Sequence, residues 1–102
     1  MRVFISQPMR NKTQEAIKNE RLRIMSFARV NYGDDVREIA SYLGPNAQFD
    51  PLEALGLSIQ MMNKADVVIF APGWEQARGC KIEHICATEY DKDIVELKED
   101  DL

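Results

Sequence analysis

Long apolar runs are missing from this sequence. No stretch approaches the roughly 20 apolar residues that span a bilayer, so the sequence predicts no membrane helix and no membrane partner. The first residues, MRVFISQPM, contain too short an apolar run for a signal peptide. We therefore expect a cytoplasmic protein.

Cysteine and histidine are scarce, with two cysteines and one histidine in 102 residues. Cys80 and Cys86 lie six residues apart in a predicted helix, where their side chains point to different sides, so we expect two reduced thiols and no disulfide. Cys80 and His84 have the spacing of two metal ligands on a helix, but no third ligand stands at a matching distance. We predict no metal, and we assign His84 to the surface or to an interface.

The sequence also lacks the signs of a dinucleotide cofactor or a nucleic-acid partner. Gly73 and Gly79 do not form a G-x-G-x-x-G motif, so we expect no dinucleotide and no other cofactor. Thirteen basic residues stand against 17 acidic ones, which gives a formal charge of −4. Binding to a nucleic acid polymer needs a basic face that releases counterions, and this balance argues against one.

A regular alternation of strands and helices is present instead. Short β-rich runs predict strands, and apolar residues at helical spacing predict helices between them. The predicted strands are residues 2–6, 36–43, 66–71 and 93–97, and residues 36–43 also fit a helix. The predicted helices start at Asn11, at Leu52 and near Gly79, and the first of them runs to Gly33.

This alternation predicts an α/β fold. Strands that alternate with helices form a parallel sheet through right-handed crossovers. We expect one small three-layer domain, residues 1–97, with a parallel sheet of four or five strands flanked by helices, of flavodoxin or Rossmann type. With 45% apolar residues the chain can bury a single core, and residues 98–102 are predicted to be an acidic tail without fixed structure.

The first predicted helix has a clear apolar stripe. Asn11 is expected to cap it, because Gln14 follows three residues later as in a capping box. Ile17, Ile24 and Ala28 recur at helical spacing and are assigned to the core. The charged positions assigned to solvent are Glu15, Lys18, Glu20, Arg21 and Arg23.

Polar or breaker-rich segments follow three of the predicted strands. They are SQPM at 6–9, GPNAQFDP at 44–51 and PGWEQARG at 72–79. In open parallel sheets, ligands bind outside the carboxyl ends of the strands, where these segments meet. The sequence therefore predicts a ligand site at this edge, with residues 44–51 as a lid or a wall of the site.

Glu83 is the candidate catalytic residue. It lies in the first turns of the third predicted helix, close to the expected ligand edge. The exposed N–H groups of a helix N-terminus favour a carboxylate, which would keep Glu83 ionised as a nucleophile or base. The plainer interpretation is a glutamate that forms a salt bridge with Arg78 or Lys81 on the same helix.

Basic and polar side chains near the strand ends are candidates for binding. Arg78, Arg10 and Lys12 could hold a phosphate or carboxylate at a helix N-terminus, or they are solvated cations. Ser6 and Gln7 could hydrogen-bond sugar hydroxyls or a base, or they are ordinary turn residues.

Two residues flank the most apolar predicted strand. Trp74 could stack on a nucleobase, or it could cover the end of the core or a subunit boundary. Asp66 opens the strand and is predicted to orient the backbone or a polar neighbour.

Three segments carry a resemblance to a known family. VFISQPM at 3–9, ADVVIFAPGWEQARGCKIEH at 65–84 and ATEY at 87–90 resemble the nucleoside 2-deoxyribosyltransferase-like superfamily. The chain is most similar to its small bacterial and phage members of the DUF4406-like type. The resemblance implies cleavage or transfer at the N-glycosidic bond of a nucleoside or nucleotide, with Glu83 as nucleophile. It also implies a homodimer or a higher homo-oligomer.

Three positions depart from the hydrolase branch of that superfamily. Phe4 stands where that branch often has a tyrosine, Ser58 where it uses an aspartate, and Ala77 where a serine grips the substrate phosphate. Ser58 remains a candidate substrate contact, because its hydroxyl could hold a water in place of the acid. The departures favour the alternative of a nucleotide-binding module without turnover. A third interpretation is purely structural, with the strand edges packed into a larger assembly.

Overall fold

The computed structural model describes residues 1–40 and 50–102 of the chain. The strands are β1 (Arg2–Ser6), β2 (Arg37–Glu38), β3 (Val67–Phe70) and β4 (Asp93–Glu96). The helices are α1 (Gln14–Tyr32), α2 (Pro51–Met62) and α3 (Arg78–Glu89), with two single 3₁₀ turns, η1 (Trp74–Gln76) and η2 (Glu99–Asp101). Within the described ranges no helix is both long and apolar enough to cross a membrane.

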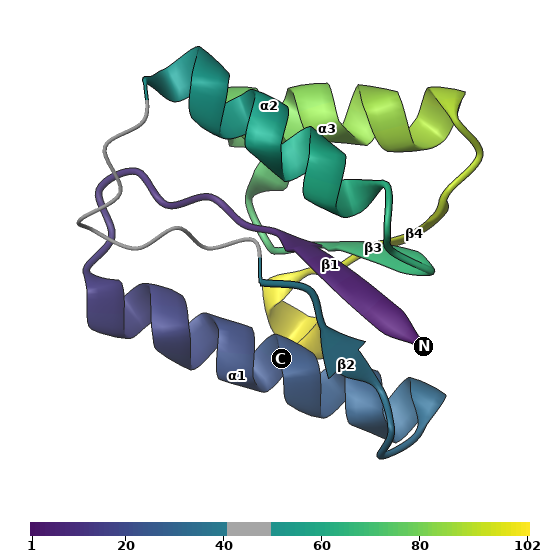
Figure 1. Cartoon of the computed structure of the whole chain (residues 1–102). Coiled ribbons are helices and arrows are strands. Elements are labelled where there is room, and N and C mark those ends of the chain that lie inside the picture. The colour runs from purple at the N-terminus through teal and green to yellow at the C-terminus, as the bar shows by residue number, and fades with distance from the viewer. Residues whose placement is uncertain (41–49) are drawn as a thin grey trace.

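The four described strands form one parallel sheet in the order β2-β1-β3-β4. α1 covers one face of this sheet, and α2 and α3 cover the other (Figure 1). The predicted three-layer α/β fold is therefore confirmed, with four strands in the described part. Val3 pairs with Val67 and Ser6 with Phe70, so the carboxyl ends of β1 and β3 lie side by side.

The side chains of β1 alternate between the two faces of the sheet. Val3 and Ile5 pack into the core under α1, whereas Phe4 packs into the core under α2 and α3. Successive side chains of a strand point to opposite faces, so Ser6 continues the Phe4 side and Gln7 the Val3 side. Both residues are buried, which places two polar side chains at the end of β1, one facing each helical layer.

The start of α1 differs from the prediction. Thr13 is the N-cap, and its Oγ1 accepts a hydrogen bond of 3.0 Å from the backbone N–H of Ala16. Asn11 has a φ of 63°, which is left-handed, whereas an N-cap residue needs an extended backbone. Asn11 therefore turns the chain from β1 toward the helix, and the prediction that it caps α1 was wrong.

The second strand is shorter than predicted. β2 comprises Arg37 and Glu38, and the backbone N–H of Ile39 still donates to Val3 O at 2.8 Å. Residues 41–43 of the predicted strand, and residues 44–49 of the predicted lid, lie outside the described residues. Pro51, predicted as part of that loop, is the first residue of α2, a position where proline fits because no N–H is required there.

The acidic tail has a defined structure, contrary to the prediction. Glu99–Asp101 form η2, and Asp101 Oδ2 accepts a hydrogen bond of 2.7 Å from the backbone N–H of Lys98. Leu102 packs against the core on the α1 side. Burial of apolar surface by this leucine favours the ordered turn.

Candidate functional site

Glu83 is buried at the carboxyl end of β1, with 7% of its surface exposed. It lies in the second turn of α3, the helix that crosses the sheet face toward which Ser6 points. The Ser6 hydroxyl donates a hydrogen bond of 2.7 Å to Glu83 Oε1. The structure thus joins two of the predicted site residues, 77 positions apart in the chain, at the predicted edge of the sheet.

The electrostatics of Glu83 differ from the prediction. Burial raises the pKa of Glu83 to about 6, and the hydrogen bond from Ser6 opposes part of that rise. The exposed N–H groups of the helix end were expected to keep the carboxylate ionised, but the side chain lies in the second turn and out of water. Burial therefore dominates its pKa, although a value of about 6 still leaves it ionised at neutral pH. The plainer alternative is not seen either, because Arg78 and Lys81 are exposed and form no ion pair with Glu83 in the described part of the chain.

A pH-dependent effect on stability follows from this raised pKa. Burial disfavours the charged carboxylate but not the neutral carboxyl. The stabilising contribution of Glu83 is therefore full below about pH 4.5 and is lost as the pH rises through about 6. Glu83→Gln stays neutral and can still accept from Ser6. We expect it to match the wild type at pH 4 and to increase the free energy of unfolding by about 2 kcal/mol at pH 8.

Urea denaturation of both proteins between pH 4 and pH 8 measures this difference. Glu89→Gln is the matched control, because Glu89 is exposed on the same helix and its replacement should change little. A Glu83→Gln protein less stable than the wild type at pH 8 would contradict the expectation.

Cys80 lies beside the same pair but remains a thiol. Burial raises the pKa of Cys80 to about 11; a hydrogen bond with Ser6 opposes the rise, and the charge of Glu83 adds to it. Thiolates are the nucleophilic form, so Cys80 is inert at neutral pH. Cys80 and Cys86 are both free, in agreement with the prediction of no disulfide.

Gln7 is committed to interior contacts on the opposite face of the sheet. Its Nε2 donates to Glu20 Oε1 at 2.8 Å and to Ile17 O at 3.0 Å, and its Oε1 accepts from Arg21 Nη1 at 3.1 Å. All these partners belong to α1. Both side-chain polar atoms of Gln7, a predicted substrate contact, are used in these bonds, which anchor α1 to the end of β1.

Glu20 and Arg21 were wrongly assigned to solvent, since each is only 6% exposed. Glu20 accepts from Gln7 and also lies 3.4 Å from Lys12 Nζ. Arg21 donates from Nε and Nη2 to Glu38 Oε2, at 2.9 and 2.7 Å. Both charges are buried because they meet polar partners in the segment after β1 and on β2. Helical spacing alone contains no sign of those partners.

Trp74 and His84 form an aromatic stack at the mouth of β3. Their ring centroids are 4.1 Å apart and their ring planes are nearly parallel. Both rings also contact Phe70 of the core. His84 therefore covers one face of the indole, and Trp74 closes the end of the core. His84, predicted at the surface or an interface, is half-buried inside this cluster, with its Nε2 3.5 Å from Glu96 Oε2.

The remaining candidates are less constrained. Arg10 and Arg78 are exposed, and Ser58 is half-buried on α2. Asp66 Oδ2 accepts from the backbone N–H of Arg2 at 2.6 Å, and this bond lowers the pKa of Asp66, so its predicted structural role is confirmed. Among residues 1–40 and 50–102 no group of three or more His, Cys, Asp or Glu side chains is placed to hold a metal ion.

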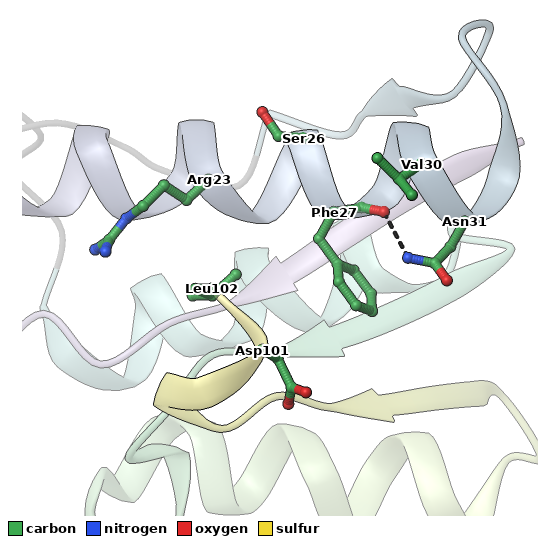
Figure 2. A pocket seen from close by; sticks show the side chains of 7 residues that line it. All are labelled: Arg23, Ser26, Phe27, Val30, Asn31, Asp101 and Leu102. Atoms are coloured by element: carbon green, nitrogen blue, oxygen red, sulfur yellow. Dashed lines mark hydrogen bonds between the residues drawn. The ribbon is translucent and has the colours of Figure 1, made fainter.

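Two surface depressions lie on the α1 side of the molecule, away from Glu83. One, of about 350 Å³, separates the second half of α1 from Asp101 and Leu102 (Figure 2). The other, of about 470 Å³, lies between Lys18, Leu22 and Glu38. Neither is lined by any of the predicted site residues.

Comparison with known proteins places the chain in a family. Residues 1–96 match the family model described as "Domain of unknown function (DUF4406)". No curated protein and no solved structure matches the chain. The resemblance noted from the sequence is thereby confirmed as far as this family. Because the match covers nearly the whole length, the chain belongs to the DUF4406 family.

Proposed function

We propose that the protein cleaves or transfers the N-glycosidic bond of a nucleoside or nucleotide, with Glu83 as the nucleophile. The observation that carries the proposal is the buried Glu83 carboxyl, oriented by Ser6 at the carboxyl end of β1. Ligands of parallel sheets bind at this edge. A buried carboxyl with a raised pKa and a single specific partner is also typical of functional sites.

The proposed reaction proceeds in two displacements. A Glu83 carboxylate oxygen attacks the anomeric carbon, and the base leaves with the electron pair of the broken C–N bond and takes up a proton from water. Water or a nitrogen of a second base then attacks the same carbon, releases Glu83 as a carboxylate, and gives up its proton to solvent, which replaces the proton taken up in the first step. Two inversions at one carbon retain its configuration.

Ser6 supports the nucleophile in this scheme. Its hydroxyl binds Oε1, and no described residue hydrogen-bonds Oε2, so that oxygen is the one we assign to the attack. A pKa of about 6 leaves the carboxylate ionised at neutral pH while making it more basic than an exposed glutamate. Phe4 lacks the hydroxyl of the tyrosine that the hydrolase branch often has at this position. Ser6 could replace it, because Ser6 brings a hydroxyl to the same face of β1 two residues further on.

Removing this hydroxyl gives a test of the arrangement. Ser6→Ala is expected to lower kcat about 10- to 100-fold, the value of one hydrogen bond to a charged group. Because the Ser6 hydrogen bond lowers the pKa of Glu83, its loss should also move the acid limb of the pH–rate profile to higher pH. Ser26→Ala, on the exposed side of α1, is the control. An unchanged acid limb in Ser6→Ala would contradict this role.

For the substrate contacts, we propose Arg10 and Arg78 as the groups that bind a phosphate or carboxylate. Both are exposed, so neither is occupied by an interior partner. Trp74 could offer only the indole face that His84 leaves uncovered, and Ser58 could hold a water or a hydroxyl from α2. The two free thiols suit a reducing compartment, so we propose a cytoplasmic location.

A nucleotide-binding module without turnover is the second candidate. It is favoured by the 7% exposure of Glu83, since an attacking oxygen must be reached by the substrate. In that case the Glu83 carboxylate would accept a hydrogen bond from a ribose hydroxyl of the ligand. A ligand at a hundred times its dissociation constant would then add about 2.7 kcal/mol to the free energy of unfolding without being consumed.

Base release is the experiment that tests the proposed function. The purified protein is incubated with ribo- and deoxyribonucleosides and their 5′-monophosphates, with and without acceptor bases, and products are resolved by chromatography. Free or exchanged base is the expected result. Thermal stabilisation by a nucleotide without any product would establish the second candidate in its place, and the absence of both effects would overturn the two together.

A further inference from the structure

The outer face of α1 carries exposed apolar side chains. Leu22 is 64% exposed and Val30 is 87% exposed, although the opposite side of the same helix is buried. Ser26 lies between them, one turn from each. Figure 2 shows Ser26 and Val30 on the other side of α1 from the Phe27 ring, which points toward the C-terminal turn. Large aliphatic side chains with this exposure gain free energy when a partner covers them.

Two of the charges on this face, which also includes Lys18 beside Leu22, have a self-complementary order. Glu15, in the first turn of α1, and Arg29, in the last, are both exposed and have no ion-pair partner in the described parts of the chain. Leu22 is seven residues from each of them. Seven residues make almost two helical turns, so all three side chains lie on the same side of the helix.

We infer that this face binds the α1 helix of a second copy of the chain in antiparallel orientation. A two-fold axis at Leu22 places Leu22 against its symmetry mate and Glu15 against Arg29 of the second copy. Each half of the interface then contains an acidic group opposite a basic one. The depressions on the two flanks of α1, one bordered by Leu22 and the other by Val30, leave room for the side chains of the second helix.

The dimer is independent of the proposed function. α1 lies on one face of the sheet, whereas α3 and Glu83 lie on the other (Figure 1). A helix of 19 residues is about 28 Å long, and a single helix pair buries less than the roughly 800 Å² per partner of a standard interface. The association should therefore be reversible and dependent on concentration.

Charge reversal gives a specific experiment. Sedimentation velocity of the wild type over rising concentration should show a shift from 11.7 kDa toward twice that mass. Glu15→Arg alone and Arg29→Glu alone place like charges opposite each other, and each should weaken self-association about tenfold. An equimolar mixture of these two variants should associate, because every mixed pair again joins opposite charges.

Control variants distinguish this face from the others. Glu89→Arg changes an exposed charge on α3 and should leave association unchanged, and Leu22→Glu should abolish it. A monomeric wild type at millimolar concentration would overturn the inference. So would single variants that associate as the wild type does, a mixture that fails to associate, or a dimer that is lost with Leu52→Glu on α2 and retained with Leu22→Glu.

Discussion

Glu83→Gln is expected to lower base release by at least about 10³-fold while the protein remains folded. Glutamine keeps the shape of the side chain and can accept the Ser6 hydrogen bond of 2.7 Å, but its amide cannot form the glycosyl ester. Loss of a nucleophile lowers kcat by orders of magnitude because no other group takes over its bond to the substrate. The rate of base release, compared with the wild type under single-turnover conditions, measures the effect.

Ligand binding by the same variant separates the two candidate functions. Retained binding with lost turnover would support the nucleophile assignment, and loss of both would indicate that Glu83 recognises the ligand. Glu89→Gln, an exposed glutamate on the same helix, should keep full activity. Activity of Glu83→Gln close to that of the wild type would contradict the proposed mechanism.

Together with the stability effect, this result would mark a functional site. The same substitution is expected to stabilise the fold at pH 8, because it removes a carboxylate whose charged form burial disfavours. A residue that costs stability and is required for activity is typical of a site selected for function. A purely structural glutamate would show no such opposition between the two effects.

Gln7→Ala should lower the free energy of unfolding by about 2–4 kcal/mol. The substitution removes three hydrogen bonds at once and leaves the Glu20 carboxylate buried without its amide partner. A domain of this size is stable by only about 5–15 kcal/mol, so the loss is a large part of the total. Urea denaturation at pH 7 measures it as a lower midpoint with an unchanged slope.

Gln60→Ala provides the control for this prediction. Gln60 is exposed on α2, so the same chemical change there removes no interior partner and should alter stability by less than about 0.5 kcal/mol. If Gln7→Ala were as stable as Gln60→Ala, the buried network around Glu20 and Arg21 would contribute nothing to holding α1 on the sheet.

Strand and helix positions could be predicted because each element carries its own pattern. β3 is a run of four large apolar residues, and all four are buried between the helical layers. Ile17, Ile24 and Ala28 of α1 are buried as their spacing predicts. The order of the elements then predicts a parallel sheet, because right-handed crossovers leave few other arrangements.

The errors occur where a polar side chain finds a partner from another element. Glu20 and Arg21 fit a solvated helix face by composition, yet Gln7 and Glu38 satisfy them in the interior. Only a distant residue decides whether a charged or aromatic side chain is buried, and periodicity within one element contains no information about it.

For this protein the sequence by itself determined the order of strands and helices and the parallel sheet, and it singled out Glu83 as a candidate at one edge of that sheet. Only the tertiary structure decided that Ser6 donates to Glu83, that burial raises its pKa to about 6, and that Gln7 faces α1. The physical reason is that local patterns follow the geometry of one strand or helix. Contacts between residues 77 positions apart depend on strand register and helix packing, which only the folded chain defines.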